Sequence, residues 1–321
     1  MLQDEILALL RAEPLAYRSG EEMSRRLGVS RAAVWKAVEG LRRAGYEIVS
    51  APNRGYRLSA APDDLRSGEL SAALSGHLVG REVVCLDCVD SGGAAEGLVI
   101  LADEQTAGRG RRGNTFQSLR GKGLFCSVLL RPQVPLDALS QLTAWTAVAV
   151  CRAIETCCGL ACGIKWTNDI IWNGKKLCGI LTELEFEAES AAAVAVVVGV
   201  GINVGQTDSD FGPDLSPLAV SLSQALGRPV RRAELAAALL TALDEMYAAF
   251  PREKGAYLEE YRLRCVTTGH EVALVRPDGS RKPAFAQGVD DDFSLVCRLP
   301  DGRERTVTAG EVSVRGLLGY V

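Results

Sequence analysis

The chain has 321 residues, of which 47% are hydrophobic and 24% are charged, and its formal net charge at pH 7 is −4. Such a mixture is typical of folded domains rather than of a disordered chain, and the length suits two or three domains. No apolar run is long enough to span a membrane, and the acidic residues Asp4 and Glu5 argue against a secretory signal peptide. We therefore expect a cytoplasmic protein without a membrane partner.

The distribution of charge indicates a partner, and the spacing of the cysteines argues against a zinc site. Residues 1–60 carry ten Lys and Arg against seven Asp and Glu, whereas the rest of the chain carries 26 against 33. A basic excess confined to the N-terminus indicates nucleic acid as a partner of that part. Among the ten cysteines, Cys85 and Cys88 have C-x-x-C spacing, but no second pair could complete a zinc site. We expect reduced, mostly buried thiols and assign no metal ligands.

The first 60 residues have the pattern of a helix-turn-helix followed by a hairpin. Residues 19–22 form a capping box that begins a helix, Gly28 ends this helix, and Ser30 can cap the next one. Two alternating runs, 46–49 and 55–58, then predict strands joined by a basic turn. Together these elements predict a winged helix.

A winged helix would bind DNA through its recognition helix and its wing tip. We assign the DNA contacts to Ser30, Arg31, Lys36 and Arg54. Contacts of these cations with phosphates would weaken as the salt concentration rises. A small helical module that serves dimerisation or acts as a lid is the alternative for this segment.

After a linker near residues 60–64, the pattern becomes mixed α and β. We predict strands at 82–89, 98–101, 124–130, 177–185 and 192–200, and helices at 136–157, 231–250 and 255–263. The two kinds of element do not alternate strictly, which favours an α+β fold with a mixed sheet and helices on one face over a doubly wound sheet. Short strands separated by Pro-Asp-Gly turns then predict a small SH3-like β-barrel. The predicted domains are residues 1–60, 66–267 and 268–321.

The most distinctive stretch of the middle domain is Gly-Arg-Gly-Arg-Arg-Gly at residues 108–113. Glycine lets backbone N–H groups approach a ligand, and guanidinium groups bind phosphate or carboxylate at two points. The spacing also matches the dinucleotide-binding fingerprint, but the strand predicted at 124–130 follows too soon for the crossover helix of that fold. We predict a loop that becomes ordered on an anionic ligand, and a solvated basic loop is the alternative.

Three polar clusters follow this stretch, at residues 165–169, 174–181 and 199–204. Each is a weak signal by itself, because a Lys-Trp pair can belong to an ordinary surface and Gly-Val-Gly can be a packing site. Together with the arginine-rich stretch they indicate one site for a polyanion.

In their order along the chain, these segments resemble the motifs of the biotin–protein ligases. The matching segments are Gly-Arg-Gly-Arg-Arg-Gly (108–113), Lys-Trp-x-Asn-Asp (165–169), Lys-Leu-Cys-Gly-Ile-Leu (176–181) and Gly-Val-Gly-Ile-Asn (199–203). With the N-terminal winged helix and the closing residues 310–315, the chain resembles the bifunctional form, which is also a biotin-responsive transcriptional repressor. The resemblance implies that biotin and ATP give biotinoyl-5′-AMP and pyrophosphate. A lysine of a biotin carboxyl-carrier domain then accepts the biotinoyl group.

The resemblance also implies roles for single residues. Arg111 and Lys176 would be catalytic at the carboxylate and the α-phosphate, and Asp169 would orient or deprotonate the acceptor lysine. Biotin would be bound by Ser91, Gly92, Gly93, Gln105, Arg109, Gly110, Arg111 and Lys176, and ATP by Arg111, Arg112, Asn114, Lys165, Asn168, Asn203 and Arg315. Mg²⁺ would bridge the phosphates of ATP. A loop ordered by the adenylate would favour a homodimer, whose two winged helices bind a palindromic operator DNA.

Among the departures from the family pattern, two lie at predicted site residues. Ser91-Gly92-Gly93 stands where the family has Ser-Thr-Asn, with little of the helix that normally follows, and Asn114 replaces an arginine. A biotin-sensing repressor with weak or no ligase activity is therefore the alternative function. A lipoate-attaching acyltransferase is a third hypothesis, although the arginine-rich stretch fits biotin chemistry better.

Overall fold

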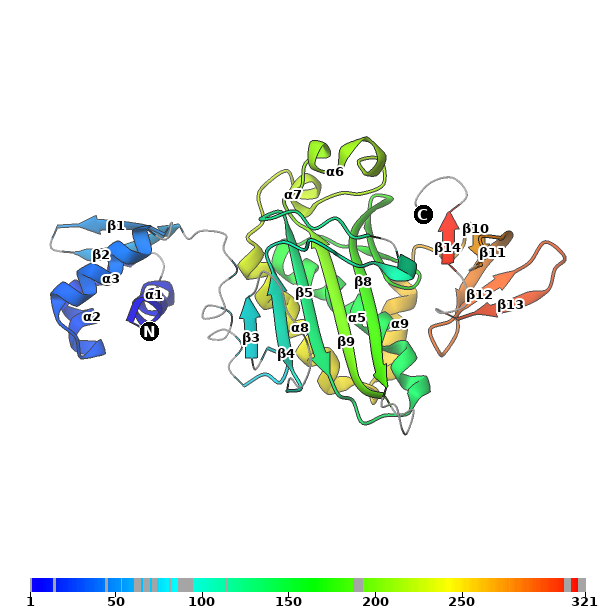
Figure 1. The fold of residues 1–321 in the computed structure, drawn as a ribbon, viewed down its shortest axis with the longest axis horizontal. Coiled ribbons are helices and arrows are strands. Elements are labelled where there is room, and N and C mark those ends of the chain that lie inside the picture. Colours follow the sequence, from blue (N-terminus) through cyan, green and yellow to red (C-terminus); the bar gives the residue numbers. More distant parts are fainter. Residues whose placement is uncertain are drawn as a thin grey trace. The chain divides into compact units, whose positions relative to one another are not determined.

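In a computed structural model the chain forms two compact units, residues 1–64 and 65–321 (Figure 1). The structure describes residues 2–13, 16–43, 46–52, 54–60, 65, 70, 74, 76–80, 82–85, 95–113, 115–186, 193–276, 278–308 and 313–316. The division into three domains stays a prediction, since the C-terminal strands belong to the same unit as the central sheet.

The first unit consists of three helices and a hairpin. Its elements are α1 (Leu2–Ala12), α2 (Gly20–Leu27), α3 (Arg31–Arg43), β1 (Glu47–Ala51) and β2 (Gly55–Ala60). As predicted, Ser19 caps α2 by accepting a hydrogen bond from the amide of Glu22 at 3.0 Å, and Gly28 ends this helix in the left-handed conformation. Ser30 caps α3 in the same way, since its hydroxyl oxygen accepts from the amide of Ala33 at 3.2 Å. The apolar faces of the three helices and the hairpin meet in one small core.

The second unit is built on a seven-stranded sheet in the order β3–β4–β5–β9–β8–β7–β6. The strands are β3 (Glu82–Cys85), β4 (Leu98–Ala102), β5 (Gly123–Leu130), β6 (Gly163–Lys165), β7 (Asp169–Trp172), β8 (Lys175–Phe186) and β9 (Ala193–Asn203). β3 and β4 are parallel, and the remaining pairs are antiparallel. This mixed sheet confirms the predicted α+β class. The end of the strand predicted at 82–89 lies outside the described residues.

Helices cover one face of this sheet, as Figure 1 shows for α5, α8 and α9. The helical elements are η1 (Arg111–Gly113), α5 (Leu136–Cys158), α6 (Asp208–Leu215), α7 (Leu222–Leu226), α8 (Arg232–Ala249) and α9 (Lys254–Arg264). α5 is mostly buried because it packs against the sheet, α8 and α9. Its Trp145 stacks on Tyr257 with ring centroids 4.1 Å apart and meets the edge of Phe250 at 5.1 Å. None of the helices in the described ranges combines the length and apolar composition that a membrane crossing needs.

The C-terminal strands form a separate five-stranded antiparallel sheet in the order β13–β12–β11–β10–β14. They are β10 (Glu271–Val275), β11 (Arg281–Val289), β12 (Leu295–Arg298), β13 (Glu304–Val307) and β14 (Ser313–Gly316). Trp166, which follows β6, ties this part to the central sheet, because its indole N–H donates to the carbonyl of Phe293 at 2.9 Å. The small β domain agrees with the predicted short strands, and its closure into a barrel stays a prediction.

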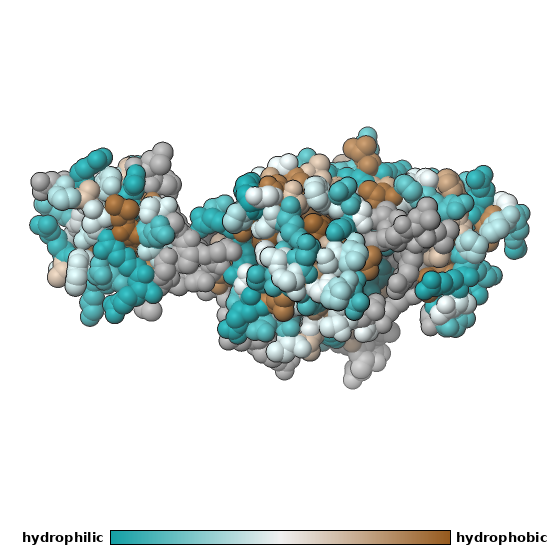
Figure 2. Space-filling model, turned by 90° about the horizontal axis from the view of Figure 1, so that it is seen from above, coloured by the Kyte–Doolittle hydropathy of each residue, from teal (hydrophilic) through white to brown (hydrophobic). Residues whose placement is uncertain are grey.

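The structure describes eight cysteine side chains. All eight are free thiols, and seven of them are buried. Cys85 and Cys88 lie outside the described side chains. Within the same part of the chain, no group of three or more His, Cys, Asp or Glu side chains could hold a metal ion. Hydrophilic residues cover most of the face seen in Figure 2, where apolar residues show as small separate spots.

Candidate functional site

Residues 103–122, the glycine-arginine loop, cross the face of the sheet opposite to the helices (Figure 1). Arg232 at the start of α8 is only 5% exposed, and it donates to the carboxylate of Asp103 at 2.6 Å and to the carbonyl of Gly123 at 3.4 Å. The amide of Gly121 also donates to the carbonyl of Asp103 at 3.3 Å. Both ends of the loop are thus fixed at one place. The sequence analysis did not find Arg232, which lies more than a hundred residues away along the chain.

The glycine-arginine loop folds back on itself between these ends. Antiparallel bridges join Gln105 to Ser118 and Arg109 to Thr115. The amide of Phe116 donates to the carbonyl of Gly108 at 2.9 Å, and a Cβ atom at Gly108 would lie 2.4 Å from the carbonyl oxygen of Phe116. Only glycine therefore fits at this position. The short 3₁₀ turn η1 forms the tip, and the next regular element is the strand β5, so the described residues here contain no crossover helix of the dinucleotide-binding kind.

The ring of Phe116 packs under the loop against the sheet. It meets the ring of Phe125 edge-on, with centroids 6.3 Å apart. A Cβ atom at Gly201 would lie 2.9 Å from this ring, and one at Gly179 would lie 3.3 Å from it. The glycines of two sequence motifs thus make room for an aromatic ring. Phe116 was missed in the sequence analysis, although a large apolar residue in a polar loop is a usable signal.

The two predicted catalytic cations are joined by a chain of polar contacts. Arg111 donates to the side-chain oxygens of Asn168 at 2.9 Å and of Thr167 at 3.2 Å. The amide group of Asn168 donates to Asp169 at 3.2 Å, and the ammonium of Lys176 contacts the same carboxylate oxygen of Asp169 at 2.6 Å. The side chains of Lys176 and Asp169 are only 25% and 15% exposed, so solvent screens this pair less than an ordinary surface pair.

Asn203 is buried beside this chain of contacts and ties the start of β8 to a neighbouring segment. Its amide group donates to the carbonyl of Lys176 at 3.3 Å and to the carbonyl of Val220 at 3.2 Å. Its oxygen accepts from Gln206 at 3.3 Å. The visible role of Asn203 is therefore to hold the backbone that carries Lys176.

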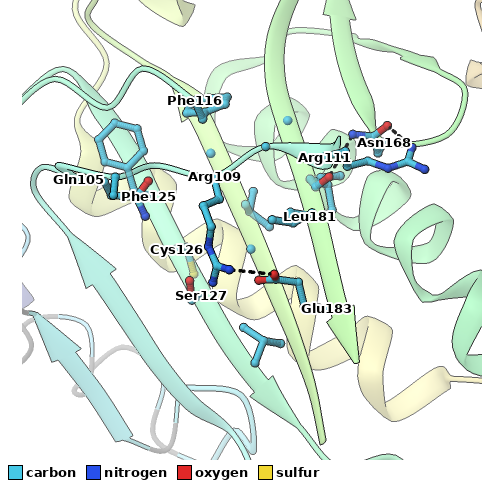
Figure 3. A pocket seen from close by; sticks show the side chains of 18 of the residues that line it. Gln105, Arg109, Arg111, Phe116, Phe125, Cys126, Ser127, Asn168, Leu181 and Glu183 are labelled. Carbon is cyan, nitrogen blue, oxygen red and sulfur yellow. Dashed lines mark hydrogen bonds and ion pairs between the residues drawn. The ribbon is translucent and has the colours of Figure 1, made fainter. Parts of the chain in front are cut away.

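A cavity of 170 Å³ lies between the glycine-arginine loop and the strands β5, β8 and β9. It is lined by six predicted site residues: Gln105, Arg109, Gly110, Arg111, Asn168 and Lys176. Figure 3 shows Arg109 extending over the sheet towards Glu183, whose carboxylate lies 3.4 Å from it. These two side chains are 75% and 45% exposed, so their ion pair is weak and can be exchanged for a ligand. Glu183 is a lining residue that the sequence analysis missed.

Cys126 on β5 also lines the cavity. Burial raises the pKa of its thiol to about 12. The thiol is therefore protonated at neutral pH and offers an apolar, polarisable wall instead of a nucleophile. The polar chemistry of the cavity belongs to its cations and to the side chains that accept hydrogen bonds from them.

None of the remaining predicted site residues lines this cavity with a side chain that the structure describes. Lys165 in β6 and Asn203 in β9 are 7% and 5% exposed and do not line it. The side chains of Arg112 in η1 and Arg315 in β14 lie outside the described part, as do Ser91, Gly92, Gly93 and Asn114. The roles of all these residues stay predictions.

The residues assigned to DNA lie on α3 and the hairpin of the first unit. Ser30 caps α3, and Arg31 and Lys36 are exposed on it. Within the described residues, neither cation has an ion-pair or hydrogen-bond partner. The guanidinium of Arg54 lies 4.5 Å from the ring centroid of Tyr17 and is exposed. These positions suit contacts with phosphates, and the contacts themselves stay predictions.

Comparison with known proteins identifies the family. Residues 86–203 match the model of the biotin/lipoate A/B protein ligase family, and residues 3–57 match that of an HTH domain. The bifunctional ligase/repressor BirA of Bacillus subtilis (strain 168) is 39% identical over 96% of this chain and 97% of its own. A biotin–[acetyl-CoA-carboxylase] ligase of Mycobacterium tuberculosis is 32% identical over 69% of this chain and 80% of its own.

The solved structures agree with this assignment. The biotin protein ligase of Aquifex aeolicus, in complex with biotin and ATP, superimposes with a TM-score of 0.63 at 26% identity. The match covers 74% of this chain and 99% of the Aquifex chain. The present chain therefore belongs to the family of bifunctional biotin protein ligases and repressors.

Proposed function

We propose that the protein is an ATP-dependent biotin–protein ligase that also represses transcription in response to biotin. The ligase activity is supported by one observation. The cations Arg111 and Lys176 line the same cavity and are linked through Asn168 and Asp169. A carboxylate and a triphosphate repel each other, so cations must hold them in attack geometry. A biotin carboxylate oxygen then attacks the α-phosphorus of ATP. The bond to pyrophosphate breaks, and biotinoyl-5′-AMP forms.

The contacts of the two cations hold them at the cavity. Arg111 donates to two neutral side chains, and a guanidinium carries five N–H donors in all. Lys176 contacts one carboxylate, and an ammonium has three donors. In the proposed complex, both cations bind oxygens of the carboxylate or the α-phosphate while Asn168 and Asp169 hold them in position.

Biotin would lie on the side of the cavity that Gln105, Arg109 and Gly110 line. At 170 Å³ this cavity is smaller than the roughly 300 Å³ at which ordinary small-molecule pockets begin. Arg109 lies across it (Figure 3), so biotin binding requires Arg109 to leave Glu183. The predicted biotin contacts of Ser91, Gly92 and Gly93 would extend the same pocket.

ATP would bind beside Asn168 and Lys176. The nucleotide contacts that we propose are those of Arg111, Arg112, Asn114, Lys165, Asn168, Asn203 and Arg315. Mg²⁺ is commonly held by substrate phosphates with one or two protein carboxylates. Asp169, which lies beside Lys176, would be the protein carboxylate in this mode. The bound ion would neutralise charge on the pyrophosphate that leaves.

The second step would transfer the biotinoyl group to a biotin carboxyl-carrier domain. An acceptor lysine in its amine form attacks the acyl carbon of the adenylate, AMP leaves, and an amide forms. Asp169 contacts the ammonium of Lys176 at 2.6 Å and would orient the amine or take its proton. The glycine-arginine loop, fixed at both ends, would cover the adenylate and slow its hydrolysis.

Repression would use the first unit as a winged helix, with contacts to operator DNA from Ser30, Arg31, Lys36 and Arg54. Two such units would be needed to bind a palindromic site, so we propose a homodimer that the bound adenylate favours. The C-terminal β domain would be an SH3-like barrel that carries Arg315 towards the nucleotide.

One experiment tests both activities. The protein is mixed with ATP, biotin and a biotin-acceptor domain, and a blot with streptavidin is expected to show a biotinylated acceptor. In parallel, retention of promoter DNA should increase when biotin and ATP are present. Arg111→Ala should lower adenylate formation at least tenfold. If no biotinylated band appears but DNA retention depends on biotin, the protein is a biotin sensor and not a ligase. If the band appears without DNA retention, the proposed repressor function is wrong.

A further inference from the structure

α3 carries a large aromatic side chain that its packing does not need. The buried face of the helix is formed by Val34, Val38 and Leu41, which are at most 2% exposed. Trp35 lies at the side of this buried face and is 57% exposed. Tryptophan is enriched at interfaces, where a partner covers its large apolar surface. The core of the first unit is complete without Trp35.

The surroundings of Trp35 identify the kind of partner. Ala32 lies three residues earlier and Arg31 four residues earlier, so both are neighbours of Trp35 on the helix surface, and Lys36 follows directly. All four are exposed. The first turn of α3 has no acidic residue, and Glu39 further along is paired with Arg42 at 2.6 Å. An apolar patch of Ala32 and Trp35 is therefore bordered by two cations.

This combination matches the major groove of DNA. Phosphates lie at both edges of the groove, and the 5-methyl group of thymine is the apolar group that its floor presents. Recognition helices contact base edges with their N-terminal residues, which is where Ala32 and Trp35 lie.

We propose that Trp35, together with Ala32, reads a thymine by contact with its 5-methyl group, while Arg31 and Lys36 bind the neighbouring phosphates. The proposal rests on the DNA-binding function proposed above and adds a determinant of specificity to it. Arg31 and Lys36 then supply affinity for any DNA sequence, and the aromatic patch supplies a preference for one base.

The test uses deoxyuridine, which differs from thymidine only by the 5-methyl group. A preferred site is first selected from random DNA with the full chain in the presence of biotin and ATP. Each thymine of the site is then replaced by deoxyuridine, and the dissociation constant is measured. For the unmodified protein, one position in each half-site should lose about fourfold in affinity, the effect of one buried methyl-sized group.

Variants connect this loss to the side chain. Trp35→Ala should bind the thymine and deoxyuridine sites equally, and Trp35→Phe should keep part of the difference. Arg31→Ala is the matched control, because it should weaken both sites equally and keep the ratio between them. Since Trp35 is mostly exposed, circular dichroism should show the same fold for all variants.

The possible results separate this inference from the function on which it rests. If no DNA site can be selected, both are overturned. If a site is selected but no deoxyuridine changes the affinity, or Trp35→Ala keeps the ratio, only the reading by Trp35 is overturned. A change in the dimerisation constant of Trp35→Ala with an unchanged ratio would also overturn it, because the patch would then be a contact between protein chains.

Discussion

The two units gather cations in different ways. On α3 in the first unit, Arg31 and Lys36 are exposed and have no ion-pair or hydrogen-bond partner within the described residues. In the second unit, Arg111 and Lys176 are partly buried and already contact Asn168 and Asp169. The first arrangement is suited to a long polyanion, to which many equivalent contacts each add a little. The second is suited to a small substrate, because its cations are fixed before the ligand arrives.

This difference predicts how each unit responds to the loss of one group. Where contacts are many and exchangeable, removal of one cation costs little and the effect depends on salt. Where two cations must hold reacting atoms, removal of one should cost orders of magnitude. Four measurements can confirm or break the comparison.

The largest effect is expected for Lys176→Met, which keeps the length of the side chain and removes its charge. The rate of adenylate formation, measured as pyrophosphate release, should fall about 100-fold, a loss comparable to that of one transition-state donor. Lys175→Met is the matched control. Its ammonium donates to the carbonyl of Ser216 at 2.9 Å and does not line the cavity, so this variant should stay close to the wild-type rate. Equal rates for the two variants would contradict the fixed-cation site.

The second effect concerns the shape of the cavity. Gly201→Ala would place a methyl group 2.9 Å from the ring of Phe116, so the ring must move into the space proposed for biotin. We expect the dissociation constant for biotin, measured by calorimetry, to rise about tenfold. Gly205→Ala is the control, since its nearest neighbour would be 3.8 Å away. An unchanged affinity in Gly201→Ala would place biotin elsewhere.

Arg31→Ala should have a smaller effect on DNA binding than Lys176→Met has on catalysis. We expect a loss of about fivefold in affinity at physiological salt, and a decrease of about one in the slope of affinity against salt concentration, both on logarithmic scales. Adenylate formation should not change, because Arg31 is remote in sequence from the cavity and belongs to the other unit. A loss of 100-fold on DNA would mean that the first unit also depends on single fixed contacts.

The smallest effect concerns ion pairs that serve only the fold of the second unit. Glu260 on α9 accepts from Arg152 at 2.6 Å and from Arg264 at 2.9 Å. Burial alone would raise the pKa of its carboxyl, but the hydrogen bonds from both arginines outweigh it and lower the pKa below the usual 4.5. The folded state therefore binds this proton less readily than the unfolded state does. Its stabilisation is complete above pH 4.5 and is lost as the pH falls through the lowered value.

Glu260→Gln should accordingly lower the free energy of unfolding by about 1 kcal/mol at neutral pH. The difference from wild type should shrink when urea denaturation is repeated at a pH below the ordinary range of a glutamate. Glu259→Gln on the same helix is exposed and should match wild type at both pH values. A constant difference at both pH values would show that the charge of Glu260 is not the cause.

The sequence predicted the ends of helices well, because these ends depend on contacts between residues that are close in the chain. Ser19, Gly28 and Ser30 begin and end helices through contacts within a few residues, and all three act as predicted. The short strands β6 and β7 and the helices α6 and α7 were not predicted. The strands β6 and β7 have three and four residues, too few to show a clear period, and such strands form because a neighbouring strand pairs with them.

The site was predicted from its motifs only in part. The motifs located Arg111, Asn168 and Lys176, which line one cavity. They did not reveal Arg232, whose contacts with Asp103 and Gly123 span more than a hundred residues, because long-range pairing leaves no local pattern. Nor could the sequence show that Asn203 donates a hydrogen bond to the backbone carbonyl of Lys176, since an asparagine at the end of a strand can equally well bind a ligand.

The alternation along β9 limits how this strand can change in length. Val198 and Val200 are buried in the core on the helix side, whereas Gly199 and Gly201 are turned towards the cavity. One inserted residue would reverse this order and put a valine side chain where the ring of Phe116 lies. Two inserted residues would restore it. Within the paired part of β9, one inserted residue should therefore be tolerated only where a bulge absorbs it, as the register shift at Glu185 and Phe186 does in the β8–β9 pair.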